Sequence, residues 1–136
     1  MPAALSGGCA CGAVRYECTG EPLFSLNCHC RDCQRETGSA FAPILAVLKS
    51  AFTLTQGIAK YFELTADSGQ KTRRAFCAEC GSRLFGEPGS RPDLVMIRAG
   101  SLDDPSAFRP SRDIYTVRAQ PWDYMNPELP KVPRLG

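Results

Sequence analysis

Seven of the eight cysteines fall into three short clusters with the spacing of metal ligands. The first is Cys9-x-Cys11, the second is Cys28-His29-Cys30-Arg31-Asp32-Cys33, and the third is Cys77-x-x-Cys80-Gly81. Thiolate sulfur is a preferred zinc ligand, and cysteines this close in sequence suit convergence on one ion better than separate disulfides. The spacing therefore favours metal binding over a disulfide framework.

The first and third clusters together supply four thiolates, which complete a tetrahedral shell. A zinc ion held by four protein ligands has no position left for a substrate. Such a site would join the N-terminal segment to a distant hairpin and contribute free energy to folding. We therefore expect a structural zinc bound by Cys9, Cys11, Cys77 and Cys80.

The middle cluster supplies three thiolates within six residues, which occupy three corners of a tetrahedron. A zinc ion with three protein ligands keeps its fourth position open, as catalytic sites do. That position accepts water or an external thiol, and zinc lowers the pKa of the bound group. We expect Cys28, Cys30 and Cys33 to bind a second zinc and to form the catalytic centre.

Spacing alone leaves other assignments open. One or more of the middle cysteines could join other cysteines in a single four-cysteine knuckle. His29, the only histidine, could complete a three-cysteine, one-histidine site. Adjacent residues of an extended turn usually point apart, so we favour a position behind the ligands or an exposed one. Cys18 has no close partner and is expected to act as a small buried hydrophobe.

The elements that position these clusters are expected to be mainly short antiparallel strands, because turn residues recur every eight to twelve positions. A short helix should run from Cys30 to Thr37 and end at Gly38, a residue that readily adopts the left-handed conformation. The strands are expected at residues 12–18, 42–48, 52–56, 59–64, 72–77, 83–85, 94–99 and 114–117, with turns at Asp67-Ser68-Gly69 and Pro88-Gly89.

Composition sets bounds on the domain and its location. A chain of 136 residues with 43% hydrophobic content fits one domain spanning 1–136, with a core of about 7–130 and a proline-rich, extended tail. No stretch approaches the roughly 20 apolar residues of a membrane span, and the start does not resemble a secretory signal. We expect a soluble cytoplasmic protein without a membrane partner, and a homo-oligomer remains open.

Charge argues against a nucleic-acid partner. The net charge of +2 is small, whereas nucleic-acid-binding domains usually carry clustered basic residues. The one tight basic group, Lys71 with Arg73-Arg74, is expected to be a solvated strand edge. No spacing rule selects a residue that would receive a substrate carboxylate from the candidates Arg31, Arg35, Arg73 and Arg74.

The ordered cysteine clusters, with their flanking residues, resemble the family of glutathione-dependent formaldehyde-activating enzymes and centromere protein V. The similarity runs from about Gly7 to Pro130. It rests on Gly8-Cys9-x-Cys11-Gly12-x-Val14-x-Tyr16, Cys28-His29-Cys30-x-x-Cys33, Thr37-Gly38-Ser39-Ala40-Phe41, Phe76-Cys77-x-x-Cys80-Gly81-Ser82 and Pro121-Trp122.

This resemblance implies an antiparallel β-tent fold, one structural zinc on the outer cysteine pairs and one open zinc on the middle cluster. It also implies a carbon–sulfur lyase that condenses a small thiol such as glutathione with formaldehyde or a similar aldehyde. The thiol sulfur would attack the aldehyde carbon beside Cys28, Cys30 and Cys33. Phe41 and Trp122 are expected in the core or a pocket wall.

Two other functions are compatible with the residues. A non-catalytic, zinc-stabilised module could bind a protein or a nucleic acid. Alternatively, the middle cluster could serve as a thiol or redox sensor, because accessible thiolates oxidise readily.

Overall fold

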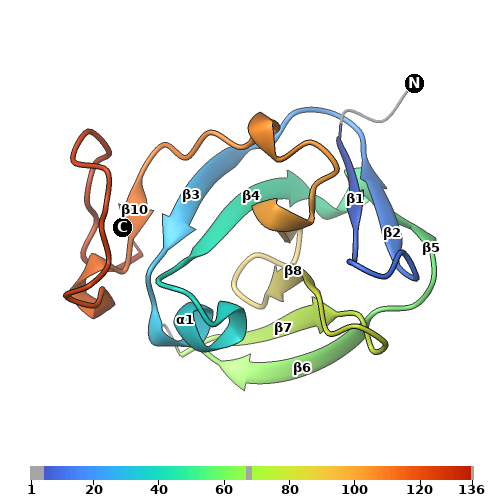
Figure 1. Ribbon diagram of the computed structural model, residues 1–136, viewed down its shortest axis with the longest axis horizontal. Helices are drawn as coiled ribbons and strands as arrows, with labels where there is room; N and C mark the ends of the chain where they lie inside the picture. The colour runs from blue at the N-terminus through green and yellow to red at the C-terminus, as the bar shows by residue number, and fades with distance from the viewer. Residues whose placement is uncertain (1–4, 67–68, 136) are drawn as a thin grey trace.

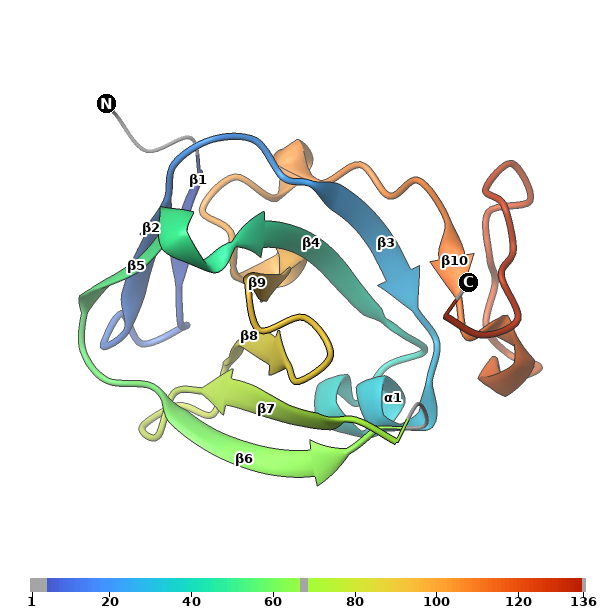
Figure 2. The same cartoon turned by 180° about the vertical axis from the view of Figure 1, so that it is seen from behind.

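Two β-sheets and one short α-helix make up the fold in the computed structural model, which describes residues 5–66 and 69–135. The larger sheet has the strand order β10-β3-β4-β9-β8-β7-β6, and the smaller has the order β1-β2-β5 (Figures 1 and 2). The strands are β1 (Leu5–Gly8), β2 (Arg15–Cys18), β3 (Phe24–Cys28), β4 (Ala42–Leu48), β5 (Phe52–Gln56), β6 (Lys60–Thr65), β7 (Lys71–Phe76), β8 (Arg83–Pro88), β9 (Leu94–Arg98) and β10 (Asp113–Ile114).

The mainly β fold confirms the prediction, and most predicted strands lie within two residues of their expected ends. The pairing of β10 with β3 is parallel, whereas the other pairings between the named strands are antiparallel. Two strands were not predicted. β1 contains Gly7-Gly8, which lowers strand propensity, and β3 runs directly into the middle cysteine cluster.

The core lies between the smaller sheet and one face of the larger sheet. Alternate residues of a strand point to opposite faces, and β4 and β9 in the larger sheet each contribute two alternate side chains to this layer. The buried side chains here include Leu45, Val47, Phe85, Val95 and Ile97 from the larger sheet, Tyr16 and Cys18 from the smaller one, and Val14 just before β2. Cys18 is fully buried in this core, as its isolation in sequence predicted.

The helix α1 (Arg31–Thr37) begins one residue later than the sequence indicated and ends at the expected residue. Cys30 is its N-cap residue, and the Cys30 sulfur accepts a hydrogen bond from the Cys33 amide at 3.3 Å. Gly38 ends the helix in the left-handed conformation, with φ of 66°. Capping therefore places two cysteines of the middle cluster on one turn of backbone.

The C-terminal tail contains no α-helix and no named strand from Tyr115 to the end of the described residues. It lies against β10 through hydrogen bonds from the Asp113 amide to Pro130 and from the Val132 amide to Asp113. The predicted strand at 114–117 stops early because Tyr115 adopts a left-handed conformation with φ of 55°. Trp122 is 68% exposed, so the prediction that it lies in a core or pocket wall was wrong.

The structure tests two further predictions, on one turn and on membrane spans, only in part. The predicted turn at Asp67-Ser68-Gly69 lies partly outside the described residues. Among the helices of the described chain, none has both the length and the apolar character needed to cross a membrane.

Gly57 is predicted to be intolerant of substitution, since two causes of strain combine there. Its φ is 75°, and a Cβ added to it would clash with the carbonyl group of Ala13. Gly57→Ala should lower the free energy of unfolding by about 1–3 kcal/mol in denaturant titrations. Gly20 is the matched control, because it has φ of 80° but no atom within 4 Å of an added Cβ. Equal losses for Gly57→Ala and Gly20→Ala would contradict the contribution of the close contact.

Candidate metal centres

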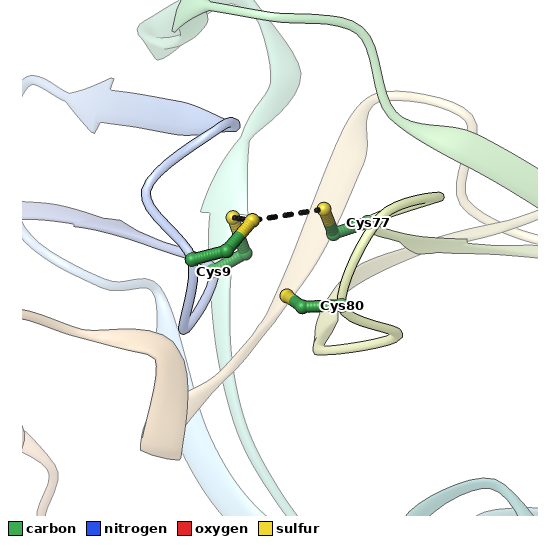
Figure 3. A group of neighbouring side chains, drawn as sticks. Cys9, Cys77 and Cys80 are labelled. Atoms are coloured by element: carbon green, nitrogen blue, oxygen red, sulfur yellow. Dashed lines mark hydrogen bonds between the residues drawn. The ribbon is translucent and has the colours of Figure 1, made fainter.

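The outer cysteine pairs meet at one point, although they lie far apart in the sequence. Cys9 and Cys11 follow β1, and Cys77 and Cys80 lie in the turn between β7 and β8. The four sulfur atoms all lie within 4.8 Å of one another. Figure 3 shows the sulfur atoms of Cys9, Cys77 and Cys80 turned toward the same point from these two loops.

The spacing of these sulfur atoms fits a tetrahedral metal ion. The Cys9 and Cys11 sulfur atoms are 3.7 Å apart, and those of Cys11 and Cys77 are 3.8 Å apart. Four sulfur atoms at about 2.3 Å from a zinc ion form a tetrahedron with edges of about 3.8 Å. The Val14 amide also donates to the Cys9 sulfur at 3.2 Å, and such a bond stabilises a thiolate. This cluster could therefore hold a metal ion.

The middle cysteines form a second cluster, and its three sulfur atoms also lie within 4.8 Å of one another. Cys28 ends β3, Cys30 caps α1 and Cys33 lies in the first turn of that helix, and all three are buried. Within the described residues, this cluster includes no histidine or carboxylate as a further candidate ligand. The arrangement differs from the single four-cysteine knuckle that the sequence left open, because the two clusters are separate.

His29 lies behind the middle cluster. Its side chain is 1% exposed, so the alternative of an exposed histidine was wrong. Its Nε2 atom is 2.9 Å from Asp113 Oδ1, and its Nδ1 atom is 2.6 Å from Asp123 Oδ2. Both ring nitrogens therefore have carboxylate partners, and the histidine connects the cluster backbone to β10 and the tail.

A buried ionic network borders the other side of the cluster. Glu36 of α1 accepts hydrogen bonds from Arg74 of β7 at 2.6 Å and from Arg98 of β9 at 2.9 Å. Arg74 also approaches the Cys33 sulfur, with 3.7 Å from Nη1 to Sγ. Two guanidinium groups and one carboxylate leave one excess positive charge beside the thiols. Arg74 is only 6% exposed, so the prediction of a solvated strand edge was wrong for this residue.

The ionic network and the middle cluster shift the pKa values of several of their members. Burial alone would raise the pKa of Glu36, but Arg98 and Arg74 hold that pKa below its usual value. Burial alone would lower the pKa of Arg74, but the negative charges of Cys33 and Glu36 raise it. In the middle cluster, hydrogen bonds from Cys28 and Cys33 lower the pKa of Cys30, whereas the same contacts hold the pKa of Cys28 above its usual value and that of Cys33 at about 11. The site therefore favours one thiolate, at Cys30, stabilised by its two neighbouring thiols.

The middle cluster lines a cavity of about 480 Å³. Its lining residues on β4 and β9 alternate with those that face the core, so the cavity lies on the opposite face of the larger sheet, where residues from β3 and β7 also line it. Figures 1 and 2 show that the larger sheet curves, so that β3 and β4 lie across from β6 and β7. A small molecule in this cavity could therefore reach the three sulfur atoms.

The sequence identified the cysteines of both clusters but missed the residues that surround them. Glu36, Arg98, Asp113 and Asp123 have no motif of their own and come from separate elements. One signal was present: Glu36 follows Cys33 by three positions, so both lie on the same face of the helix.

Arg74 is predicted to strengthen metal binding at the middle cluster through its charge. Arg74→Met should weaken the affinity of this cluster for Zn²⁺ by about 10- to 100-fold, the usual effect of removing a group that supports a ligand. Arg98 still neutralises Glu36 in this variant, so the fold should be retained. Competition with a chromophoric chelator would measure the affinity. Arg73→Met is the control, since Arg73 is exposed on the same strand. Equal affinities of the two variants would rule out this role.

Comparison with known proteins agrees with this architecture. A protein of Rhodobacter sphaeroides with a solved crystal structure is similar to this chain at 20% sequence identity, with a TM-score of 0.60. The similarity covers 93% of this chain and 99% of that protein, and it concerns the fold. A family model described as glutathione-dependent formaldehyde-activating enzyme matches residues 4–118. Since that match includes both cysteine clusters, the chain belongs to the family of glutathione-dependent formaldehyde-activating enzymes.

Proposed function

We propose that this protein is a zinc-dependent carbon–sulfur lyase that joins a small thiol to an aldehyde and cleaves the resulting adduct. Glutathione and formaldehyde are the pair that the family description names. The observation that carries the proposal is the position of the buried Cys28, Cys30 and Cys33 at the wall of a cavity large enough for a small thiol.

In this proposal, each cysteine cluster binds one zinc ion. The outer four cysteines form the structural site, and the middle three form the catalytic site. At the catalytic site, zinc would supply an open position that favours the thiolate form of a cosubstrate thiol. Free thiols are prone to oxidation, so the proposal includes a reducing compartment such as the cytoplasm. We also propose that residues 1–136 form a single domain, because one core cluster draws residues from Cys9 to Leu102.

The reaction forms one bond between sulfur and carbon. The thiol loses its proton, its electron pair attacks the aldehyde carbon, and the π electrons of the carbonyl group move to oxygen. A proton from solvent then completes the hydroxyl group, so the product is an S-hydroxyalkyl adduct. The excess positive charge of Arg74, Arg98 and Glu36 stabilises negative charge in this region. Leu26 and Ile114 exclude water from the wall nearest Cys28.

The two cysteine clusters are predicted to respond differently to substitution. Cys80→Ser should unfold much of the domain, because structural zinc binding contributes on the order of 10 kcal/mol, comparable with the whole stability of a domain. Cys30→Ser should keep the fold, because serine is also a good N-cap residue for α1. Circular dichroism together with zinc stoichiometry would show two ions in the parent protein and one in folded Cys30→Ser. Equal unfolding of both variants would contradict separate roles.

The catalytic proposal is tested by the rate of adduct formation. Exchange spectroscopy by NMR can measure how fast glutathione and formaldehyde interconvert with their adduct. The zinc-loaded protein should increase this rate, and Cys30→Ser should return it to the uncatalysed value because it removes a ligand. Cys18→Ala is the matched control, since Cys18 is buried away from both clusters and should leave the rate unchanged. Acceleration by Cys30→Ser equal to that of the parent would exclude the proposed centre.

A further inference from the structure

The cavity beside the middle cluster has walls that are mainly apolar. Its lining includes Phe24, Leu26, Ile44, Leu94, Met96 and Ile114. Phe24, Leu26 and Cys28 alternate along β3 and share one face of the sheet, so the row of apolar side chains ends at a sulfur atom. A volume of about 480 Å³ is typical of sites for small organic molecules, and formaldehyde would fill little of it. The walls therefore suit a substrate with an apolar body.

The charged residues of the lining all have the same sign. They are Arg74, Arg91, Arg98 and Arg112, and no aspartate or glutamate of the described chain lines the cavity. Arg74 and Arg98 form ion pairs with Glu36, and Arg91 Nη2 is 3.0 Å from Asp93 Oδ2. This distribution favours an anionic ligand.

Arg112 is the lining arginine best placed to receive that anion. It is half-buried, and within the described residues its guanidinium group has no hydrogen bond or ion pair. A buried or partly buried guanidinium is stabilised by a carboxylate, with which it can form two parallel hydrogen bonds. Arg112 thus supplies a free binding group in a cavity that is otherwise largely apolar.

The separation between Arg112 and the sulfur atoms follows from the strand register. Ile114 lies opposite Cys28 in the parallel pair of β10 and β3, and Arg112 precedes Ile114 by two residues. At about 3.3 Å per residue, Arg112 is displaced by about 7 Å along the strand from the level of Cys28. An alkyl chain of six carbons has a comparable length.

We propose that the cavity selects a thiol substrate with an apolar body and a carboxylate, which binds with its carboxylate at Arg112 and its sulfur beside the middle cluster. This inference rests on the function proposed above and specifies its substrate class. Glutathione is a poorer fit to these walls, because its amide groups would lose water without gaining enough hydrogen-bonding partners.

Calorimetric titration of the zinc-loaded protein with four compounds tests the selection. 6-Mercaptohexanoate has all the features, 6-mercaptohexanol lacks the charge, hexanoate lacks the thiol, and glutathione has a polar body. We expect 6-mercaptohexanoate to bind about tenfold or more tightly than each of the others, the scale of one hydrogen bond to a charged group. Tighter binding of glutathione than of 6-mercaptohexanoate would overturn the inference.

Two variants test whether Arg112 and Met96 determine which ligand binds. Thermal unfolding checks that each variant is folded. Arg112→Gln should weaken the binding of 6-mercaptohexanoate by about tenfold and leave the affinity for 6-mercaptohexanol unchanged. Arg109→Gln is the matched control, because Arg109 is exposed and does not line the cavity. Met96→Gln should weaken the binding of 6-mercaptohexanoate and 6-mercaptohexanol but not that of glutathione, because glutamine is similar in size to methionine but makes the wall polar. The inference fails if Arg112→Gln and Arg109→Gln bind 6-mercaptohexanoate equally well.

The same titrations separate this inference from the proposed function. If 6-mercaptohexanoate binds most tightly but the protein accelerates no adduct formation with it or with glutathione, the lyase function fails while the selection proposed here stands. If the protein accelerates adduct formation but binds glutathione most tightly, the lyase function stands and the selection proposed here is wrong.

Discussion

A single excess positive charge, buried between α1 and the larger sheet, constrains the rest of the structure. It arises because Arg74 and Arg98 share one carboxylate, that of Glu36. An uncompensated buried charge costs several kcal/mol, so the network needs a nearby negative charge. The thiols of the middle cluster supply that charge when they ionise, and Cys33 is in direct contact with Arg74. The helix, β7, β9 and the cysteines therefore depend on one another for electrostatic balance.

The larger sheet forms both a core and a cavity wall, because successive side chains along its strands point to opposite faces. Leu45 and Ile97 point into the core that faces the smaller sheet, while Ile44 and Met96 point into the cavity. In a simple sandwich the second face of a strand would face solvent, whereas here it lines a cavity that a ligand could enter. This arrangement lets a small domain contain both a core and a binding cavity.

The sequence predicted the parts of the structure that local signals specify. The strands β4 and β5 and the helix after Cys30 have clear propensity, turn or capping signals, and their ends were close to correct. The strand β3 was missed because its residues Phe-Ser-Leu-Asn-Cys lack continuous strand formers, and tertiary pairing with β4 decides its conformation.

The cysteine clusters were also predictable, since ligands a few residues apart in sequence stay close together in space whatever the rest of the fold. Their surroundings were not, because Glu36, Arg74 and Arg98 meet only after three elements have packed. Arg74 looked like a surface residue, and nothing in its neighbours along the chain indicated that a carboxylate on the helix would bury it. Long-range ion pairs of this kind depend on topology, which single-sequence signals do not specify.

The two cysteine clusters close chain loops of very different length, and this affects the order in which they can assemble. The middle cluster lies within one short segment, whereas Cys11 and Cys77 are 66 positions apart. The entropy lost on closing a loop grows with its length, so the middle cluster meets a smaller barrier. During synthesis from the N-terminus, the middle thiols come together while the partners of Cys9 and Cys11 are still untranslated. The outer cluster can form only after the hairpin of β7 and β8 has left the ribosome, which makes its closure a late step of maturation.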